Sequence, residues 1–197
     1  NDDENILSFQ YSLDDNTFLG ERYIKNIKAS TPQGMFYQRD ILGNWVAGEG
    51  IIYQAFADDP KKFETERQFN YETINIGVDF GGNKSKHAFC CTGLTRGYKE
   101  IVALASEKHE PDTPERLNAQ FIAFVKRTLQ KYGRIDCIYC DSAEQVLIRG
   151  MRKALEDNNL NIALKNAIKN EIINRIRIVN VLMTTSRFFY VKNENDP

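Results

Sequence analysis

The sequence from Ile74 to Gly82 reads INIGVDFGG. Isoleucine or valine stands at every second position, with Asn, Gly and Asp between them, and this period of two is typical of a β-strand with one buried face. Asp79 closes the alternation, and a glycine pair follows soon after it. The stretch therefore predicts a strand that carries a carboxylate at its end.

Regular signals continue on the C-terminal side of this strand. His87 to Leu94 and Tyr98 to Glu107 predict two more strands, joined by a tight connection. Thr113 and Pro114 provide an N-cap and a first-turn proline for a helix that Gly133 closes. Further elements are expected at 135–140 (strand), 143–157 (helix), 161–164 (strand), 168–183 (helix) and 188–191 (strand).

This order of elements predicts an α/β fold. A meander of strands followed by alternating helices and strands indicates a mixed sheet of about five to six strands flanked by helices, as in the ribonuclease H-like arrangement. In that arrangement the first and fourth strands are neighbours. We expect this domain to span residues 67–197, whereas 1–66, with its short polar pieces, is expected to be a linker or the tail of another domain.

Composition narrows the class of protein. The chain of 197 residues is 42% hydrophobic and 27% charged, which is ordinary for a globular domain. No apolar run approaches the length of a membrane span, and the acidic N-terminus does not resemble a signal peptide, so we expect a protein that is neither secreted nor bound to a membrane. The chain begins without Met, which favours a fragment of something longer.

Charge is balanced overall but uneven along the chain. Twenty-six basic residues stand against 27 acidic ones. Between Asn161 and Lys192, however, six Lys and Arg residues stand against Glu171 alone. This segment is either a positive binding face or an ordinary solvated surface.

The cysteines favour packing over chemistry. Cys137 and Cys140 form a C-x-x-C pattern within a predicted strand, where an odd offset sends the side chains to opposite faces. Cys90 and Cys91 are adjacent and face apart for the same reason. We interpret all four as small buried residues in a reducing compartment.

Two aspartates form the candidate site. Asp79 ends the first strand and Asp141 ends the fourth, so the predicted topology brings them together. Carboxylates are hard oxygen ligands suited to Mg²⁺ or Mn²⁺, and two such ions catalyse phosphodiester hydrolysis in many nucleases. We therefore predict that Asp79 and Asp141 are catalytic metal ligands, with Gly81 and Gly82 leaving room for a phosphate that Lys84, Lys86 and His87 contact.

Other interpretations of these residues stay open. Asp141 is also placed to cap the following helix, with Glu144 completing a capping box, and Asp79 is a typical turn residue. The Asp79–Gly81 triplet matches a kinase motif, but the glycine-rich loop and H-R-D sequence of kinases are missing upstream. An actin- or sugar-kinase-like nucleotide site is the main competing class, and it requires a second lobe and a second phosphate turn.

A family resemblance adds to this interpretation. The sequence resembles the large subunit of tailed-bacteriophage terminases over nearly its whole length. The resemblance is carried, in order, by LDDNTFL (13–19), MFYQRDILGNWVAGEGIIY (35–53), IGVDFG (76–81), IYCDS (138–142) and residues 170–183. It implies the C-terminal nuclease domain of a DNA-packaging motor, whose ATPase domain lies upstream.

The resemblance also implies a function and partners. The activity is endonucleolytic cutting of concatemeric double-stranded phage DNA with two Mg²⁺ or Mn²⁺ ions, and the partners are the terminase small subunit and the portal protein of the procapsid. The location is the host cytoplasm and, transiently, the portal vertex. A third acidic ligand is expected near the C-terminus, where Asp196 and Glu171 are weak candidates; we expect either a truncated chain or an unusual last ligand. The alternative is a non-catalytic module that binds DNA or the portal.

Overall fold

The computed structural model describes residues 9–31, 34–44, 51–82, 85–141, 143–192 and 194. The chain divides into two compact units. One consists of residues 1–62 and 170–185, and the other of residues 63–169 and 186–197. The second unit contains the sheet and both candidate aspartates.

The second unit is built on one mixed sheet. Its strands are β1 (Glu64–Thr65), β2 (Tyr71–Asp79), β3 (His87–Thr95), β4 (Ile101–His109), β5 (Cys137–Cys140), β6 (Leu164–Asn166) and β7 (Phe188–Val191). They lie in the order β1-β7-β4-β3-β2-β5-β6. The predicted α/β class and the mixed sheet are confirmed, and the sheet gains a two-residue strand, β1, that sequence periodicity did not indicate.

The pairing directions follow from the connections. β2, β3 and β4 form an antiparallel meander. β5 and β6 then add in parallel beside β2, each reached through a helix. The predicted neighbourhood of the first and fourth strands is therefore confirmed as the parallel pair β2 and β5, in which Val78 lies beside Cys140.

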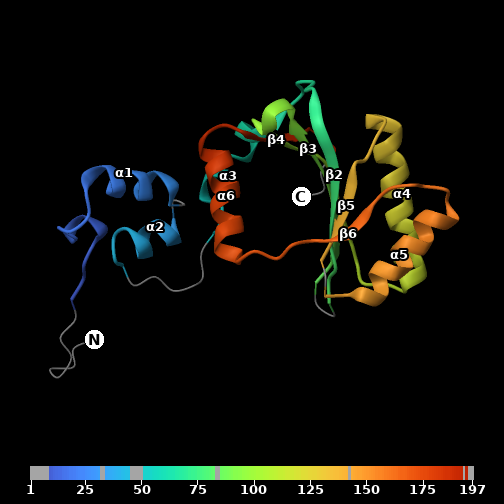
Figure 1. The fold of residues 1–197 in the computed structure, drawn as a ribbon, viewed down its shortest axis with the longest axis horizontal. Coiled ribbons are helices and arrows are strands. Elements are labelled where there is room, and N and C mark those ends of the chain that lie inside the picture. Colours follow the sequence, from blue (N-terminus) through green and yellow to red (C-terminus); the bar gives the residue numbers. More distant parts are fainter. Residues whose placement is uncertain are drawn as a thin grey trace. The chain divides into compact units, whose positions relative to one another are not determined.

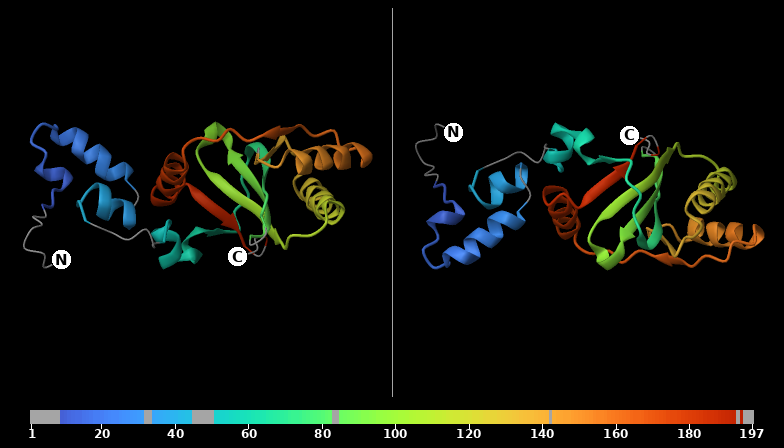
Figure 2. Two further views of the ribbon diagram at one scale, coloured as in Figure 1. Left: turned by 90° about the horizontal axis from the view of Figure 1, so that it is seen from below. Right: turned by 90° about the horizontal axis from the view of Figure 1, so that it is seen from above.

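Two helices cover one face of this sheet: α4 (Pro114–Tyr132) and α5 (Gln145–Asp157) lie together on the same side of it (Figures 1 and 2). α4 begins as predicted, because the Thr113 side chain accepts a hydrogen bond from the amide of Arg116 and Pro114 takes the first turn. It ends at Gly133, whose φ of 77° is the left-handed conformation that glycine adopts readily.

The core lies between these helices and the sheet. Ile74, Ile76 and Val78 of β2 point into it. Fully buried members of the core include Ile76, Phe89, Phe121, Ile138 and Met151. β3 alternates buried and half-buried positions along its whole length. One face of the sheet is therefore fixed against α4 and α5, and the positions between the core residues point to the opposite face.

The cysteines follow this alternation. All four are free thiols, and Cys140 and Cys91 belong to the core cluster while Cys137 does not. Burial raises the pKa of Cys91 and of Cys140 to about 12, so both thiols are neutral at physiological pH.

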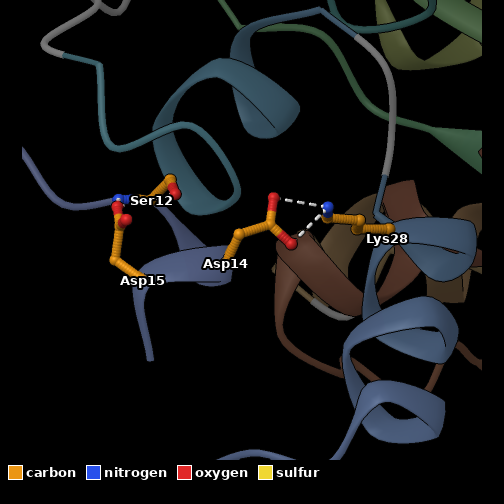
Figure 3. A network of polar contacts seen from close by, with 4 residues as sticks. All are labelled: Ser12, Asp14, Asp15 and Lys28. Carbon is orange, nitrogen blue, oxygen red and sulfur yellow. Dashed lines mark hydrogen bonds and ion pairs between the residues drawn. The ribbon is translucent and has the colours of Figure 1, made fainter. Parts of the chain in front are cut away.

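The first unit is made of short helices. They are a 3₁₀ turn at Leu13–Asp15, α1 (Glu21–Ser30), α2 (Met35–Asp40), α3 (Gln54–Asp58) and α6 (Ile172–Thr184). Figure 3 shows the polar contacts at its start, where Lys28 binds both carboxylate oxygens of Asp14 at 2.6 Å and Ser12 donates to Asp15. Of these, α6 was expected from the sequence, whereas the 3₁₀ turn, α1, α2 and α3 were not, because short polar pieces were the main signal in residues 1–66.

Two predicted helices begin later than the sequence suggested. α6 begins at Ile172, and Ile168, which was expected on its apolar face, precedes it and is 87% exposed. α5 begins at Gln145 and not at Ala143. Among the residues that the structure describes, no helix has the length and apolar character needed to cross a membrane.

Candidate metal centre

Asp79 and Asp141 lie at equivalent positions on neighbouring strands. The parallel register pairs Gly77 with Tyr139 and Val78 with Cys140. The next residue after each member of the second pair is an aspartate, Asp79 after Val78 and Asp141 after Cys140. The pairing continues to this point, because the amide of Asp141 donates a hydrogen bond to the carbonyl of Val78 at 3.1 Å. Neighbouring strands run about 4.8 Å apart, which brings the two aspartate backbones close together.

Both aspartates belong to the same face of the sheet. In β2 the core residues Ile76 and Val78 point toward α4 and α5, and Asp79 is exposed on the other side. In β5 Cys140 is a core residue, so Asp141, one position later, points away from the core as well. The opposite arrangement, with the carboxylates on different faces, would have made a shared ion impossible.

The environments of the two carboxylates differ. Asp79 is exposed, and no described residue forms a hydrogen bond or an ion pair with its side chain. The side chain of Asp141 is 33% exposed, and its Oδ1 accepts a hydrogen bond from the amide of Ala143 at 3.1 Å. The same Oδ1 lies 2.6 Å from Nζ of Lys169.

The capping interpretation of Asp141 is wrong. α5 begins at Gln145 with Glu144 at the N-cap position, and the cap makes no side-chain hydrogen bond. The bond from Asp141 to Ala143 instead closes the turn that precedes the helix. Asp141 therefore keeps its carboxylate at the strand end.

The loop after Asp79 uses its residues differently from the prediction. A Cβ on Gly81 would lie 2.0 Å from the carbonyl oxygen of Ser85, so this glycine is required by the closure of the loop itself. A Cβ on Gly82 would meet nothing within 4 Å. Only Gly82 leaves open space of the kind that a phosphate would need.

The basic residues of this loop also have other roles. His87, expected to contact phosphate, is only 5% exposed, and its Nδ1 accepts a hydrogen bond from the amide of Gly81 at 3.1 Å. Lys86 forms an ion pair with Glu110 at 2.8 Å. Lys84 lies outside the described residues.

A third acidic ligand is not found in the described part of the chain. Within it, no group of three His, Cys, Asp or Glu residues is placed to hold a metal ion. Asp196 lies outside the described residues, and Glu171 belongs to the other compact unit, at the N-cap of α6.

Lys169 is the functional candidate that sequence reasoning missed. It follows β6, which pairs in parallel with β5, and the amide of Ala167 still donates to the carbonyl of Cys140 at 2.8 Å. The chain therefore reaches the end of β5 just before Lys169. The parallel order of β5 and β6 is the signal that would have placed this lysine beside Asp141.

A surface groove lies elsewhere on the same unit. It has a volume of about 830 Å³ and runs between α4 and α5, with Lys126, Arg149 and Lys153 on its rim. Because α4 and α5 cover the core face of the sheet, this groove is on the opposite side from Asp79 and Asp141. It does not contribute to the candidate metal centre.

Solved structures share this fold. The nuclease domain of the phage P22 large terminase matches with a TM-score of 0.54 and 15% sequence identity over 74% of each chain. The human cytomegalovirus terminase nuclease domain matches with a TM-score of 0.52 and 9% identity over 73% of this chain and 77% of that one. A manganese-soaked, inhibitor-bound form of the latter gives 0.53 and 9% identity over 72% and 76%.

These matches establish the fold of a terminase nuclease domain, and the resemblance found in the sequence is confirmed at that level. At these identities they establish no more than the fold. No protein-family profile and no curated protein matches the sequence.

Proposed function

We propose that this chain is a divalent-metal-dependent endonuclease domain of a viral DNA-packaging terminase, and that it cuts concatemeric double-stranded DNA. The observation that supports this most directly is the placement of Asp79 and Asp141 at equivalent ends of two neighbouring parallel strands, on one face of the sheet. The shared fold with terminase nuclease domains, one of them soaked with manganese, agrees with the proposal.

The donor set fits Mg²⁺ or Mn²⁺. Both side chains supply hard carboxylate oxygens, and the neighbouring thiol of Cys140 is buried and neutral, so it does not compete as a soft ligand. Mg²⁺ is commonly held by one or two carboxylates and completes its coordination with water and phosphate oxygens. Asp79 and Asp141 are therefore sufficient to hold an ion weakly, and a third ligand would strengthen the site.

The proposed chemistry divides between the ions and the chain. Bound ions, two in our proposal, supply an activated water and stabilise the leaving oxygen of the phosphodiester. Asp79 and Asp141 provide the negative charge that holds those ions at the sheet end. Gly82, three residues after Asp79, would admit a Cβ with no contact within 4 Å, and Lys165 and Lys169 bring positive charge to the same end of the sheet, where a DNA backbone requires it.

Plasmid cleavage tests this proposal. The full chain is incubated with supercoiled plasmid and Mn²⁺, and we expect nicking and linearisation that Asp79→Asn and Asp141→Asn each reduce at least a hundredfold, since the removal of a charge-stabilising group at a reacting centre costs about 10²–10³ in rate. Asp157→Asn is the matched control, because Asp157 pairs with Lys153 on α5, away from the site. Full activity in either site variant would refute the assignment.

A binding module is the second candidate. The basic residues between Asn161 and Lys192 favour it, because Lys165 on β6 is exposed on the same face as the aspartates. A module without catalysis would lose DNA affinity in Lys165→Ala and keep it in Asp79→Asn, with no cleavage in any variant. Gel-shift assays of DNA binding and cleavage assays on the same variants separate the two functions.

The remaining partners follow from the terminase proposal. An ATPase domain upstream would move the DNA, the small subunit would select it, and the portal protein would receive it at the procapsid vertex in the host cytoplasm. Co-purification of the complete large subunit with the portal protein tests this part. Persistent failure to associate, with cleavage intact, would leave a nuclease with another biological role.

A further inference from the structure

Lys169 forms an ion pair with one of the two proposed metal ligands. Its Nζ lies 2.6 Å from Oδ1 of Asp141, and the two side chains are 51% and 33% exposed. The backbone brings the lysine there, because the hydrogen bond from Ala167 to Cys140 keeps the chain beside β5 to the end of the strand. The pairing of β6 with β5 therefore brings Lys169 to Asp141, at the proposed metal site.

We propose that Lys169 is a resident counter-ion of the metal centre: it neutralises Asp141 when no divalent ion is bound, gives up the carboxylate when one binds, and then contacts a DNA phosphate. The inference rests on the proposed function, since it takes Asp141 to be a metal ligand. It adds a positioning residue that the sequence alone did not single out from the other basic residues between Asn161 and Lys192.

The ion pair between Lys169 and Asp141 is weak enough for a divalent ion to replace the lysine. A partly exposed ion pair contributes little net free energy, because water competes for both charges. A divalent ion carries twice the charge of an ammonium group, so it competes well for the same oxygen and repels the lysine once bound. The cost of displacing Lys169 is therefore small.

Asp141 does not depend on Lys169 for its position. Its Oδ1 also accepts the amide hydrogen of Ala143, and its own amide is bound to Val78. These backbone bonds hold the carboxylate at the strand end after the lysine leaves. The removal of Lys169 should therefore free a ligand without disordering it.

Lys165 provides a matched control four positions earlier. It lies on β6 beside Tyr139, which is two residues before Asp141. Its side chain therefore points to the same face of the sheet as Asp141 but lies farther from the strand end. It is exposed, and no described acidic residue forms an ion pair with it. Lys165→Met and Lys169→Met remove the same charge from the same sheet edge, but only the second removes the contact with Asp141.

Direct manganese binding tests the first half of the proposal. The electron paramagnetic resonance signal of free Mn²⁺ is followed as each full-length variant is added, without DNA, so the result does not depend on activity. We expect Lys169→Met to bind Mn²⁺ about three- to tenfold more tightly than the unmodified chain, through the loss of a competing charge. We expect Lys165→Met to change the affinity less than twofold.

The other outcomes of this titration are decisive as well. Unchanged Mn²⁺ binding in Lys169→Met would overturn the inference. Weaker Mn²⁺ binding would also overturn it, because it would show that Lys169 supports the Asp141 carboxylate. If Asp141→Asn still abolishes binding in that case, the proposed function stands without the inference. Undetectable Mn²⁺ binding in both the unmodified chain and Lys169→Met would refute both.

DNA binding tests the second half. Without divalent ions, Lys169 is held by Asp141, so we expect Lys169→Met to bind a short duplex as well as the unmodified chain. With Ca²⁺ added, the freed lysine contributes a phosphate contact, and the variant should bind two- to fivefold more weakly. Lys165→Met should lose affinity under both conditions. An equal loss in Lys169→Met with and without Ca²⁺ would overturn the exchange.

Discussion

The amide of Gly81 donates a hydrogen bond to Nδ1 of His87 over 3.1 Å, across the loop that follows Asp79. His87 is 5% exposed, and its ring packs edge-on against Phe80 at 6.3 Å. Nδ1 is therefore the acceptor nitrogen of this imidazole ring. The histidine anchors the loop to β3 and thereby fixes the chain next to the proposed metal ligand.

Replacement of His87 tests this anchor. His87→Leu leaves the Gly81 amide without its acceptor, so we expect the free energy of unfolding to fall by about 1–3 kcal/mol, as for other buried donors that lose a partner. Plasmid cutting should fall with it, because Asp79 loses its fixed surroundings. Urea unfolding gives the first value and cleavage assays the second.

His109→Leu is the control for this prediction. His109 pairs with His87 in the register of β3 and β4, but its Nε2 contacts Glu107 and no residue of the loop. We expect this variant to keep more of the cutting activity than His87→Leu. Equal activity in the two variants would contradict the role of His87 as a loop anchor.

The two glycines after Asp79 give a matched pair. Gly81→Ala places a Cβ 2.0 Å from the Ser85 oxygen and 2.5 Å from the Lys86 carbonyl carbon, both backbone atoms that cannot move away separately. We expect a loss of about 1–3 kcal/mol in the free energy of unfolding, as for overpacking elsewhere. Gly82→Ala meets open space and should change stability by less than about 0.5 kcal/mol.

Cleavage by the Gly82 variant carries separate information. If the space beside Gly82 admits a phosphate, Gly82→Ala should reduce DNA cutting while its thermal unfolding stays unchanged. Larger side chains at the same position should reduce cutting further. Full activity in Gly82→Leu would show that DNA does not approach the site from this loop.

The positions of several strands and of α4 were predictable because their signals are local. Alternation marks β2 and β3, and Thr113, Pro114 and Gly133 mark both ends of α4 through capping and backbone conformation. The neighbourhood of β2 and β5 followed from the match between the order of elements and the ribonuclease H-like arrangement. The sequence was therefore sufficient to predict that the strand ends carrying Asp79 and Asp141 lie together.

The parts that were missed depend on contacts distant in sequence. β1 has only two residues and exists through its pairing with β7, so it has no period to detect. Gly81 is confined by Ser85 and Lys86, which only the closed loop reveals. Lys169 reaches Asp141 through the pairing of β6 with β5, and a run of basic residues in the sequence does not show which of them meets a carboxylate.

A reciprocal pair of hydrogen bonds joins β2 to the segment before β5. The amide of Ile74 donates to Oδ2 of Asp136 at 2.7 Å, and the amide of Asp136 donates to the carbonyl of Ile74 at 2.8 Å. This clamp lies at the opposite end of the strand pair from the aspartate site. It sets the register that later places Asp79 beside Asp141.

Loss of the clamp should therefore affect both stability and the site. Asp136→Ala removes the side-chain acceptor of Ile74, and because Asp136 is 37% exposed we expect a cost of only about 1 kcal/mol in the free energy of unfolding. Mn²⁺ affinity should fall slightly if the register loosens. Asp157→Ala, which removes an exposed ion pair on α5, should leave both quantities unchanged.

The buried thiol of Cys140 predicts a pH dependence of stability. Burial raises its pKa from 9.0 to about 12, so between these values the unfolded chain releases a proton that the folded chain keeps. The free energy of unfolding must then fall as the pH rises through this window, by up to about 1.4 kcal/mol per pH unit, while the contribution is complete and constant below pH 9.0.

Cys140→Ala removes this titration. Urea unfolding of both proteins from about pH 7.5 to about pH 10.5 should show a constant difference in stability up to about pH 9 and a shrinking one above it. Above about pH 9, ionisation of the Cys140 thiol in the unfolded state lowers the free energy of unfolding only in the chain that carries this thiol. The loss of buried volume in the variant shifts all of its values equally and does not affect the trend. A difference that stays constant over the whole range would mean that the thiol is hydrated, and the core packing described around the end of β5 would then be incorrect.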